Sequence, residues 1–398
     1  MFLPRKRLLQ TIYSSLIISF LLTNCLDNIY ISSKGVNSFN KSNDNFMRGV
    51  SFTGFSKEAF LSDFSNESIE QLKTDGGSWI AICFWWFIDD LNSTKIYPDF
   101  DWYSCSNKSI CTAIGKAKEL GLNVMLKPMV DSKSGEWRAY INPTNAWFDS
   151  YKAFITSWAR FAENYQVEML CIGCEFSLSE SYSEKWRAIT AGIRAVYSGK
   201  LTYAANHDAY NQITWWDELD YIGIDAYYQL TDTNNPSLEE LLDKWDELSS
   251  VIGNVSDHWD LPVVFTEIGY RSIDGCNRWP WDWQREARID FEEQRKCYEA
   301  VFRGLWGKSW WAGIFWWDWT PYESTNWQKD DGYTPQYKPA ESVLSTWYSE
   351  EFGDSPTYSW TSEVKISAFI IVLNITGLII VQLINKKINK IPLMNNKS

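Results

Sequence analysis

The feature that most constrains this chain is a pair of apolar runs that each end in a glutamate. Residues 262–270 read PVVFTEIGY, and residues 167–175 read VEMLCIGCE. Such runs predict buried parallel strands, each carrying its acid, Glu267 or Glu175, to its carboxyl end. If the strands close into an α/β barrel, those ends share one lip, which is where barrel enzymes hold their catalytic groups. The two glutamates are therefore a candidate catalytic pair.

Six further strand-like runs alternate with helix-like segments, as expected of successive β/α units. The eight predicted strands span residues 49–52, 79–84, 123–128, 169–173, 201–205, 221–226, 263–267 and 313–317. Helices are predicted over 109–120, 148–164, 183–197, 238–252 and 288–305. The segment 148–164 places aromatic and aliphatic residues on one helical face, which would pack on a sheet. These units predict an α/β fold, a single (β/α)8 barrel over residues 47–350.

The two ends of the chain have a different composition. Residues 1–26 combine basic residues with an apolar run, which predicts a signal peptide or signal anchor, and residues 27–46 form a polar linker. Residues 366–384 form an uncharged apolar run close to the roughly 20 residues that a transmembrane helix needs. Residues 351–365 would be a stalk and the lysine-bearing residues 385–398 a cytoplasmic tail. We therefore expect a cell-surface protein, anchored in the membrane, with its barrel outside the cell.

Composition limits the class of ligand. The net charge of -13 disfavours nucleic acid and polyanions, because like charges repel. The chain has 24 Trp, 21 Tyr and 21 Phe, more than a barrel core requires. Most of these rings belong in the core, and the excess can line a groove for the flat faces of sugars. A neutral polymer fits this composition best.

The cysteines and sequons fit an exported domain. Cys105 with Cys111 and Cys276 with Cys297 are plausible disulfides, although spacing alone does not fix the pairing. The remaining cysteines of the predicted strands are interpreted as buried thiols, and no metal or other cofactor is expected. Sequons that could carry surface glycans lie at Asn66, Asn92, Asn107 and Asn254.

Alternation along a strand predicts which residues face the barrel axis. If Glu267 points inward, then so should Phe265 and Val263. If Glu175 points inward, then so should Gly173 and Cys171, which are small enough for a crowded interior.

Two carboxylates about 5–5.5 Å apart can cleave a glycosidic bond with retention, one as acid/base and the other as nucleophile. Their pKa values must then differ, and a partly apolar pocket raises that of the acid. Either glutamate could instead form a salt bridge at the lip.

The sequence resembles the retaining glycoside hydrolases of clan A, and more closely glycoside hydrolase family 113, the endo-β-1,4-mannanase family. The resemblance runs in order from about residue 47 to 348. The stretches that carry it are 48–51, 96–99, 124–128, 135–138, 172–175, 201–206, 220–227, 265–272 and 315–317.

The resemblance implies roles for individual residues. Glu175 would be the acid/base, Glu267 the nucleophile, and Tyr227 a hydrogen-bond donor to the nucleophile. Trp317 or Trp316 would be the platform under the sugar. Further residues implied to line the sugar subsites are Asn206, Lys127 and Trp137. Tyr227 could also be an ordinary barrel tyrosine, Lys127 a structural ion-pair partner and Asn206 a loop-closing residue.

We therefore expect a monomeric retaining glycoside hydrolase that cleaves a β-linked polysaccharide, most specifically β-1,4-mannan. Two alternatives stay open. One is a relative that acts on β-glucan or transfers glycosyl groups, and the other is a non-catalytic barrel that binds surface glycans. The chain lacks the phosphate-binding, dinucleotide-binding and nucleophile-elbow motifs that would begin a nucleotide or serine-hydrolase interpretation.

Overall fold

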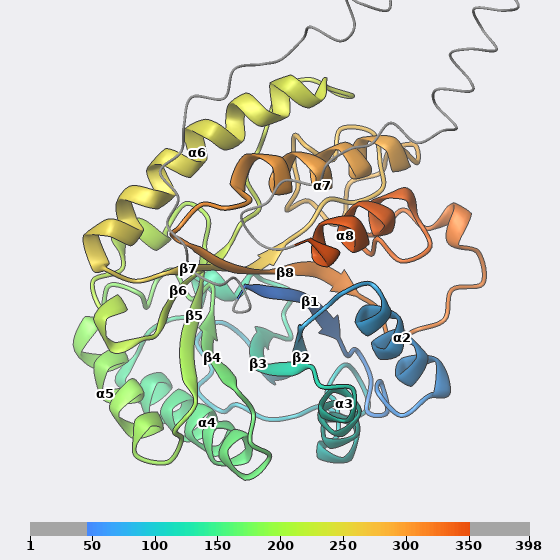
Figure 1. The fold of residues 1–398 in the computed structure, drawn as a ribbon. Coiled ribbons are helices and arrows are strands. Elements are labelled where there is room, and N and C mark those ends of the chain that lie inside the picture. Colours follow the sequence, from blue (N-terminus) through green and yellow to red (C-terminus); the bar gives the residue numbers. More distant parts are fainter. Residues whose placement is uncertain (1–45, 351–398) are drawn as a thin grey trace, which may run out of the picture. The chain divides into compact units, whose positions relative to one another are not determined.

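The computed structural model describes residues 46–350, which form a closed barrel of eight parallel strands in sequential order (Figure 1). The strands are β1 (Met47–Thr53), β2 (Trp79–Ile88), β3 (Asn123–Ser132), β4 (Met169–Cys174), β5 (Lys200–Asn206), β6 (Tyr221–Asp225), β7 (Val263–Ile268) and β8 (Trp311–Trp319). Each overlaps a predicted run. β2, β3 and β8 extend beyond the prediction, and their extra residues reach the lip.

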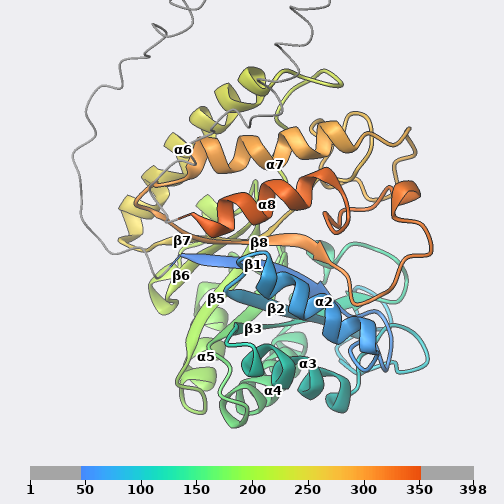
Figure 2. The same ribbon diagram turned by 45° about the vertical axis from the view of Figure 1, so that its right-hand side comes forward.

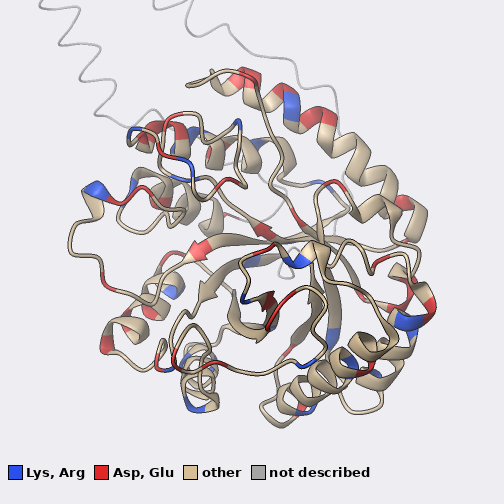
Figure 3. Cartoon of the chain, turned by 180° about the vertical axis from the view of Figure 1, so that it is seen from behind, with Lys and Arg blue, Asp and Glu red and all other residues tan. Residues whose placement is uncertain are grey.

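Helices follow the strands and cover the barrel. They are α2 (Asp63–Thr74), α3 (Asn107–Glu119), α4 (Asn145–Asn164), α5 (Ser183–Arg194), α6 (Leu238–Trp259), α7 (Phe291–Leu305) and α8 (Pro339–Ser349). Short 3₁₀ turns lie at Arg138–Tyr140, Tyr210–Gln212, Trp216–Glu218 and Trp327–Lys329. Figure 2 shows α7 and α8 running alongside each other next to β8. Acidic and basic positions are interspersed over the surrounding helices (Figure 3).

Local sequence explains where the helices begin. Ser62, Ser106 and Thr144 each accept a hydrogen bond from a backbone N–H in the first turn of the helix that follows. Ser237 and Glu240 form a reciprocal capping box at the start of α6. Such caps satisfy N–H groups that have no partner within the helix. These caps fix the residues at which α2, α3, α4 and α6 begin.

The core has two layers. The larger lies between strands and helices and contains most of the buried aliphatic and aromatic residues, Phe265 and Trp316 among them. The smaller fills the barrel and includes Met125, Cys171 and Val264. The barrel is therefore a packed core rather than a channel, and chemistry is confined to its ends.

The prediction of which side chains face the barrel interior is wrong for parts of β4 and β7. Val264 faces the interior, whereas Phe265 packs against Trp310 and Trp311 on the helix side. A Cβ on Gly173 would meet Tyr203 and Trp186, which also lie in the outer layer. The strand registers shift near both glutamates, and such bulges break strict alternation. Cys171 does face the interior, as predicted.

The predicted disulfides are corrected by the structure. All seven cysteines within residues 46–350 are free thiols. The Cys105 thiol donates to the Gly54 carbonyl, whereas Cys111 interacts with Tyr165, so these two side chains have different neighbours. Cys276 and Cys297 contact each other as buried thiols.

The segments predicted at the two chain ends lie outside the described residues. This holds for the signal segment 1–26, nearly all of the linker 27–46, the stalk 351–365, the transmembrane segment 366–384 and the tail 385–398. Within residues 46–350, none of the helices has both the length and the apolar character to cross a membrane.

Candidate active site

The predicted nucleophile, Glu267, lies near the carboxyl end of β7 and is 5% exposed. Its Oε1 lies 2.5 Å from the Nζ of Lys127, and its Oε2 accepts a hydrogen bond of 2.8 Å from the Tyr227 hydroxyl. Burial and the neighbouring Asp225 carboxylate raise the pKa of Glu267, and the Lys127 ammonium opposes them. Lys127 and Tyr227 thus stabilise the charged form of this carboxylate.

Lys127 was predicted either to line a sugar subsite or to form a structural ion pair, and its position distinguishes the two. Its side chain is fully buried, and its Nζ also lies 3.3 Å from the Oδ1 of Asp225. It is therefore an ion-pair partner of two carboxylates beneath the lip. A buried lysine without such partners would lose its charge. The predicted role of Lys127 as a sugar-lining residue does not fit this burial.

The predicted acid/base, Glu175, follows β4 and remains partly exposed. Its Oε2 accepts a hydrogen bond of 3.2 Å from the indole N–H of Trp137, and its Oε1 one of 3.3 Å from the Asn206 amide. Desolvation and then the Asp225 carboxylate raise the pKa of Glu175 to about 8. A carboxylic acid with this pKa holds its proton at neutral pH and can donate it.

The backbone of Glu175 has an unusual conformation. Its φ is 55°, in the left-handed region that non-glycine residues rarely adopt. The backbone N–H of Glu175 donates to the Ala204 carbonyl at 2.8 Å, which ties this position to β5. Strained residues of this kind cluster at functional sites. Here the strain turns Glu175 onto the lip directly after the inward-facing Cys174.

A polar network lies between the surroundings of the two glutamates. Arg138 contacts both carboxylate oxygens of Asp131, at 2.7 and 3.1 Å, and its Nη1 lies 3.1 Å from the Cys174 Sγ. Cys174 in turn donates to Asp225 Oδ2 at 3.3 Å. Asp225 also accepts from the Thr266 hydroxyl at 2.8 Å. The network therefore runs from beside Glu175 to the Lys127–Glu267 pair.

Sequence reasoning assigned no role to Arg138, Asp131 or Asp225. Two signals could have indicated them. Asp225 ends an apolar strand in the same manner as the glutamates, and Arg138 follows Trp137 directly in a stretch that carries the family resemblance.

The two tryptophans at the end of β8 lie in different environments. Trp317 is partly exposed and packs edge-on to Trp85 with ring centroids 6.3 Å apart. Trp316 is fully buried and stacks on Tyr298 with centroids 3.7 Å apart. A sugar cannot reach Trp316, so its assignment as an alternative platform is wrong. Alternation along β8 turns the two rings to opposite sides.

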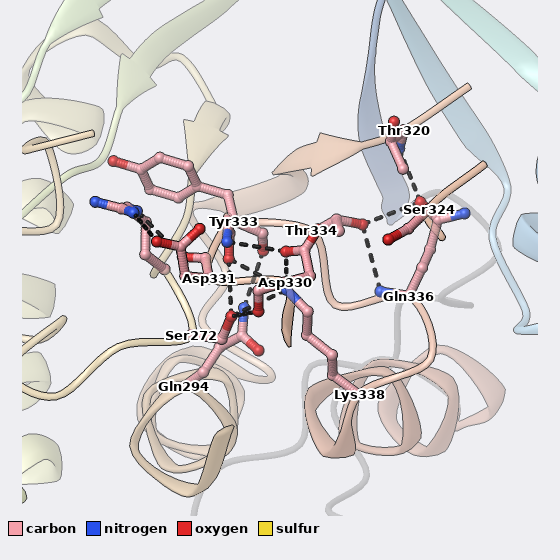
Figure 4. Close-up of polar contacts among 12 residues, drawn as sticks. Ser272, Gln294, Thr320, Ser324, Asp330, Asp331, Tyr333, Thr334, Gln336 and Lys338 are labelled. Atoms are coloured by element: carbon pink, nitrogen blue, oxygen red, sulfur yellow. Dashed lines mark hydrogen bonds and ion pairs between the residues drawn. The ribbon is translucent and has the colours of Figure 1, made fainter. Parts of the chain in front are cut away.

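The loops after β7 and β8 are joined by a second polar cluster (Figure 4). Lys338, at the start of α8, donates to Ser272 Oγ at 3.0 Å and to Asp330 Oδ1 at 2.7 Å. The Gln294 amide donates to the backbone carbonyls of Tyr270 and Tyr333. The cluster holds Tyr333, whose ring lies edge-on to that of Tyr227 with centroids 6.3 Å apart. It therefore fixes the wall of the site beside the nucleophile.

Two clusters of side chains within residues 46–350 have the spacing of possible metal ligands, with ligand atoms within 4.8 Å of one another. The first cluster comprises Cys174, Asp225 and Glu267. The positively charged Lys127 contacts Glu267 and Arg138 contacts Cys174, so these side chains already have cationic partners. The second comprises Asp274, Asp290 and Glu293. There the Glu293 carboxylate accepts backbone N–H groups of Asn235, Gly275 and Asn277, so it organises turns.

A (β/α)8 barrel with two carboxylates of unequal environment at its lip defines a glycoside hydrolase of the barrel class. The chain belongs to Glycoside Hydrolase Family 113, whose sequence profile matches residues 50–338. The expected family is thereby confirmed, and the chain is a glycoside hydrolase.

Solved structures agree with this assignment. A GH113 β-1,4-mannanase, solved as a complex, is 29% identical at a TM-score of 0.70, with 76% of this chain and 99% of that chain covered. The GH113 β-mannanase AaManA from Alicyclobacillus acidocaldarius, in complex with ManMIm, is 28% identical at a TM-score of 0.70, covering 78% and 99%. A β-glucuronidase from Ruminococcus gnavus, 15% identical at a TM-score of 0.53 over 76% and 49%, shares the fold alone. No curated protein sequence matches the chain.

Proposed function

We propose that this protein hydrolyses β-1,4-linked mannan by double displacement, with Glu267 as nucleophile and Glu175 as acid/base. The observation that carries the proposal is the contrast between the two carboxylates. Glu267 is held by an ammonium and a phenolic donor, whereas burial and a neighbouring carboxylate raise the pKa of Glu175 to about 8. One is suited to attack and the other to donate a proton. The substrate class is supported by the likeness to β-mannanases.

In the first step, a Glu267 oxygen attacks the anomeric carbon while the glycosidic C–O bond breaks. The proton of Glu175 passes to the leaving oxygen, and a glycosyl ester forms on Glu267. In the second step, the Glu175 carboxylate takes a proton from water, and the water oxygen attacks the anomeric carbon. Glu267 leaves as a carboxylate, and Glu175 is protonated again.

Other lip residues have supporting roles in this proposal. The Trp137 and Asn206 donors orient the Glu175 carboxyl group. Tyr227, whose pKa burial raises well above its usual value, stays protonated and keeps donating to Glu267. Trp317 offers a partly exposed ring for one face of the sugar.

The test is a substrate panel. The purified full-length chain is incubated with β-1,4-mannan, β-glucan and xylan, and new reducing ends are counted. The proposal requires that mannan be cleaved fastest and that the anomeric configuration of the first product, followed by NMR, be retained. Binding without any release of reducing ends would instead support a non-catalytic glycan-binding barrel. Preference for glucan, or transfer of glycosyl groups to another sugar, would support the other alternative.

The proposed place of action is the cell surface. Its support is the sequence alone, namely the apolar runs at 12–22 and 366–384. Fractionation of cells that express the whole chain tests it: activity should sediment with membranes and be released by detergent. Activity in the soluble fraction would contradict it.

A further inference from the structure

A continuous series of ring contacts leads away from Trp317 toward the β1 and β2 side of the lip. Trp317 packs edge-on to Trp85 at the end of β2, with centroids 6.3 Å apart. Trp85 stacks on Phe55, which follows β1, with centroids 4.6 Å apart. Trp85 is nearly buried, whereas Phe55 is 36% exposed. The series therefore passes from the site to solvent.

The loop between β2 and α3 continues the series. The Tyr103 ring lies edge-on to Phe55 with centroids 6.1 Å apart and contacts Trp102 at 5.0 Å. Tyr103 is 44% exposed and Trp102 is 40% exposed. We refer to these four rings as the aromatic strip: Trp85, Phe55, Tyr103 and Trp102. Single exposed rings are ordinary, but contiguous ones mark a binding surface.

The loop that carries the outer rings is fixed to the barrel. The backbones of Phe87 and Tyr97 exchange two hydrogen bonds, of 2.8 and 3.0 Å. The Ser104 hydroxyl, next to Tyr103, donates to the Trp85 carbonyl at 2.7 Å and accepts the Asp99 N–H at 2.7 Å. The rings are therefore held in place before a ligand arrives, which lowers the entropic cost of binding.

The members of the aromatic strip have different free faces. Trp102 stacks on Phe87 with centroids 4.9 Å apart, and the Lys133 ammonium lies 5.6 Å from its ring centroid. Trp102 therefore supports the loop. Phe55 stacks on Trp85 and is 36% exposed, and Tyr103 meets Phe55 and Trp102 at an angle. These two rings are left to contact a ligand.

The charges around the aromatic strip favour a neutral ligand. Lys133 is paired with Asp99 at 2.6 Å, and the Tyr97 hydroxyl is hydrogen-bonded to Asp89. The positive charge of Lys133 next to Trp102 is therefore offset by a carboxylate. Sugar rings present C–H faces that pack on aromatic rings, while their hydroxyls stay in water.

We propose that Phe55 and Tyr103 form a distal subsite for sugar units of the same polysaccharide that is cleaved between Glu175 and Glu267. This inference rests on the proposed function and adds a second place where the chain is held. Continuity with the Trp317 platform through Trp85 is the argument for this occupant. A long substrate would contact the aromatic strip, and a short one would not reach it.

The experiment compares kcat/KM for soluble β-1,4-mannan with kcat/KM for an aryl β-mannobioside, in the full-length chain. In Tyr103→Ala and Phe55→Ala, the ratio of these two constants should fall about tenfold, which corresponds to about 1.4 kcal/mol of lost binding to the long substrate. Tyr103→Phe, which keeps the ring, should restore the ratio. The control Tyr165→Ala removes a ring that is 43% exposed at the end of α4, away from the lip, and should leave the ratio at its wild-type value.

A wild-type ratio in Tyr103→Ala, with folding verified by its melting temperature, would overturn the distal subsite. Phe55→Ala serves as an independent second variant if Tyr103→Ala does not fold. An equal fall in Tyr165→Ala would also overturn it, because the effect would then be unspecific. Failure of the proposed function looks different, since the wild-type chain itself would not cleave mannan.

Discussion

The Nζ of Lys127 lies 2.5 Å from the Oε1 of Glu267 in a site from which water is almost excluded. The Lys127 ammonium is the main positive charge next to the candidate nucleophile. The contact joins β3 to β7 across the barrel, between residues 140 positions apart in the sequence. The reactivity of Glu267 therefore depends on a residue that touches no sugar in our account.

Replacing Lys127 with Met should raise the pKa of Glu267, because the ammonium stabilises its charged form. Attack requires the ionised carboxylate, so the acidic limb of kcat/KM against pH should move upward by about one to three pH units. Leaving Asp225 and Glu267 without a counterion should also cost about 3–5 kcal/mol of stability. Lys118→Met is the control, since Lys118 pairs with Glu168 at 2.8 Å on a partly exposed surface. An unshifted acidic limb in a folded Lys127→Met protein would refute this role.

Tyr227→Phe removes only the hydroxyl that donates to Glu267 Oε2 at 2.8 Å. We expect kcat to fall about 10²-fold, because the loss of one donor to a charged group costs about 1.5–3 kcal/mol. The melting temperature should change little, since the ring is kept. A wild-type kcat would instead identify Tyr227 as an ordinary barrel tyrosine.

Glu175 should control the basic limb of the pH profile. Its pKa is raised to about 8, and it must be protonated to assist the leaving group, so activity should decline as pH rises through about 8. Glu175→Gln should slow natural glycans about 10²–10⁴-fold, spare aryl glycosides with good leaving groups, and abolish this limb. Glu180→Gln is the control, because burial raises the pKa of Glu180 to about 7, but its carboxylate accepts a hydrogen bond from the Tyr203 hydroxyl in the outer layer of the core. A uniform loss across leaving groups would argue against Glu175 as the acid.

The neighbouring tryptophans of β8 should give opposite phenotypes. Trp316→Ala should lower the free energy of unfolding by about 3–5 kcal/mol, because the ring is fully buried against Tyr298. Trp317→Ala should chiefly weaken substrate binding and raise KM, because its ring is partly exposed. Chemical unfolding and steady-state kinetics on both variants distinguish the two. The exchange of these phenotypes would overturn the assignment of the platform.

The barrel itself was predictable from the sequence. Its strands are apolar runs, and their order follows from the alternation with helices, which is why all eight were located. The family resemblance placed Glu175, Glu267 and Tyr227 together, and the structure brings these residues to one lip. Their chemical roles stay predictions.

Other features depend on contacts that local patterns do not encode. The inward side of β7 changes at a bulge, so counting back from Glu267 gave the wrong face for Phe265. Lys127 could be assigned to a sugar or to an ion pair until its burial was known. The choice between Trp316 and Trp317 required the position of Tyr298 on α7. Cysteine spacing likewise could not show that Cys105 and Cys111 have different neighbours.

The most direct test of the central claim is to trap the intermediate on its carboxylate. The wild-type chain is treated with an activated 2-deoxy-2-fluoro-β-mannoside, which slows release of the glycosyl ester, and its peptides are analysed by mass spectrometry. We expect a single glycosyl adduct on Glu267 of the wild-type chain and no adduct in Glu267→Ala. An adduct on another residue would contradict Glu267 as the nucleophile. Hydrolysis with retained configuration but without any adduct would contradict it as well.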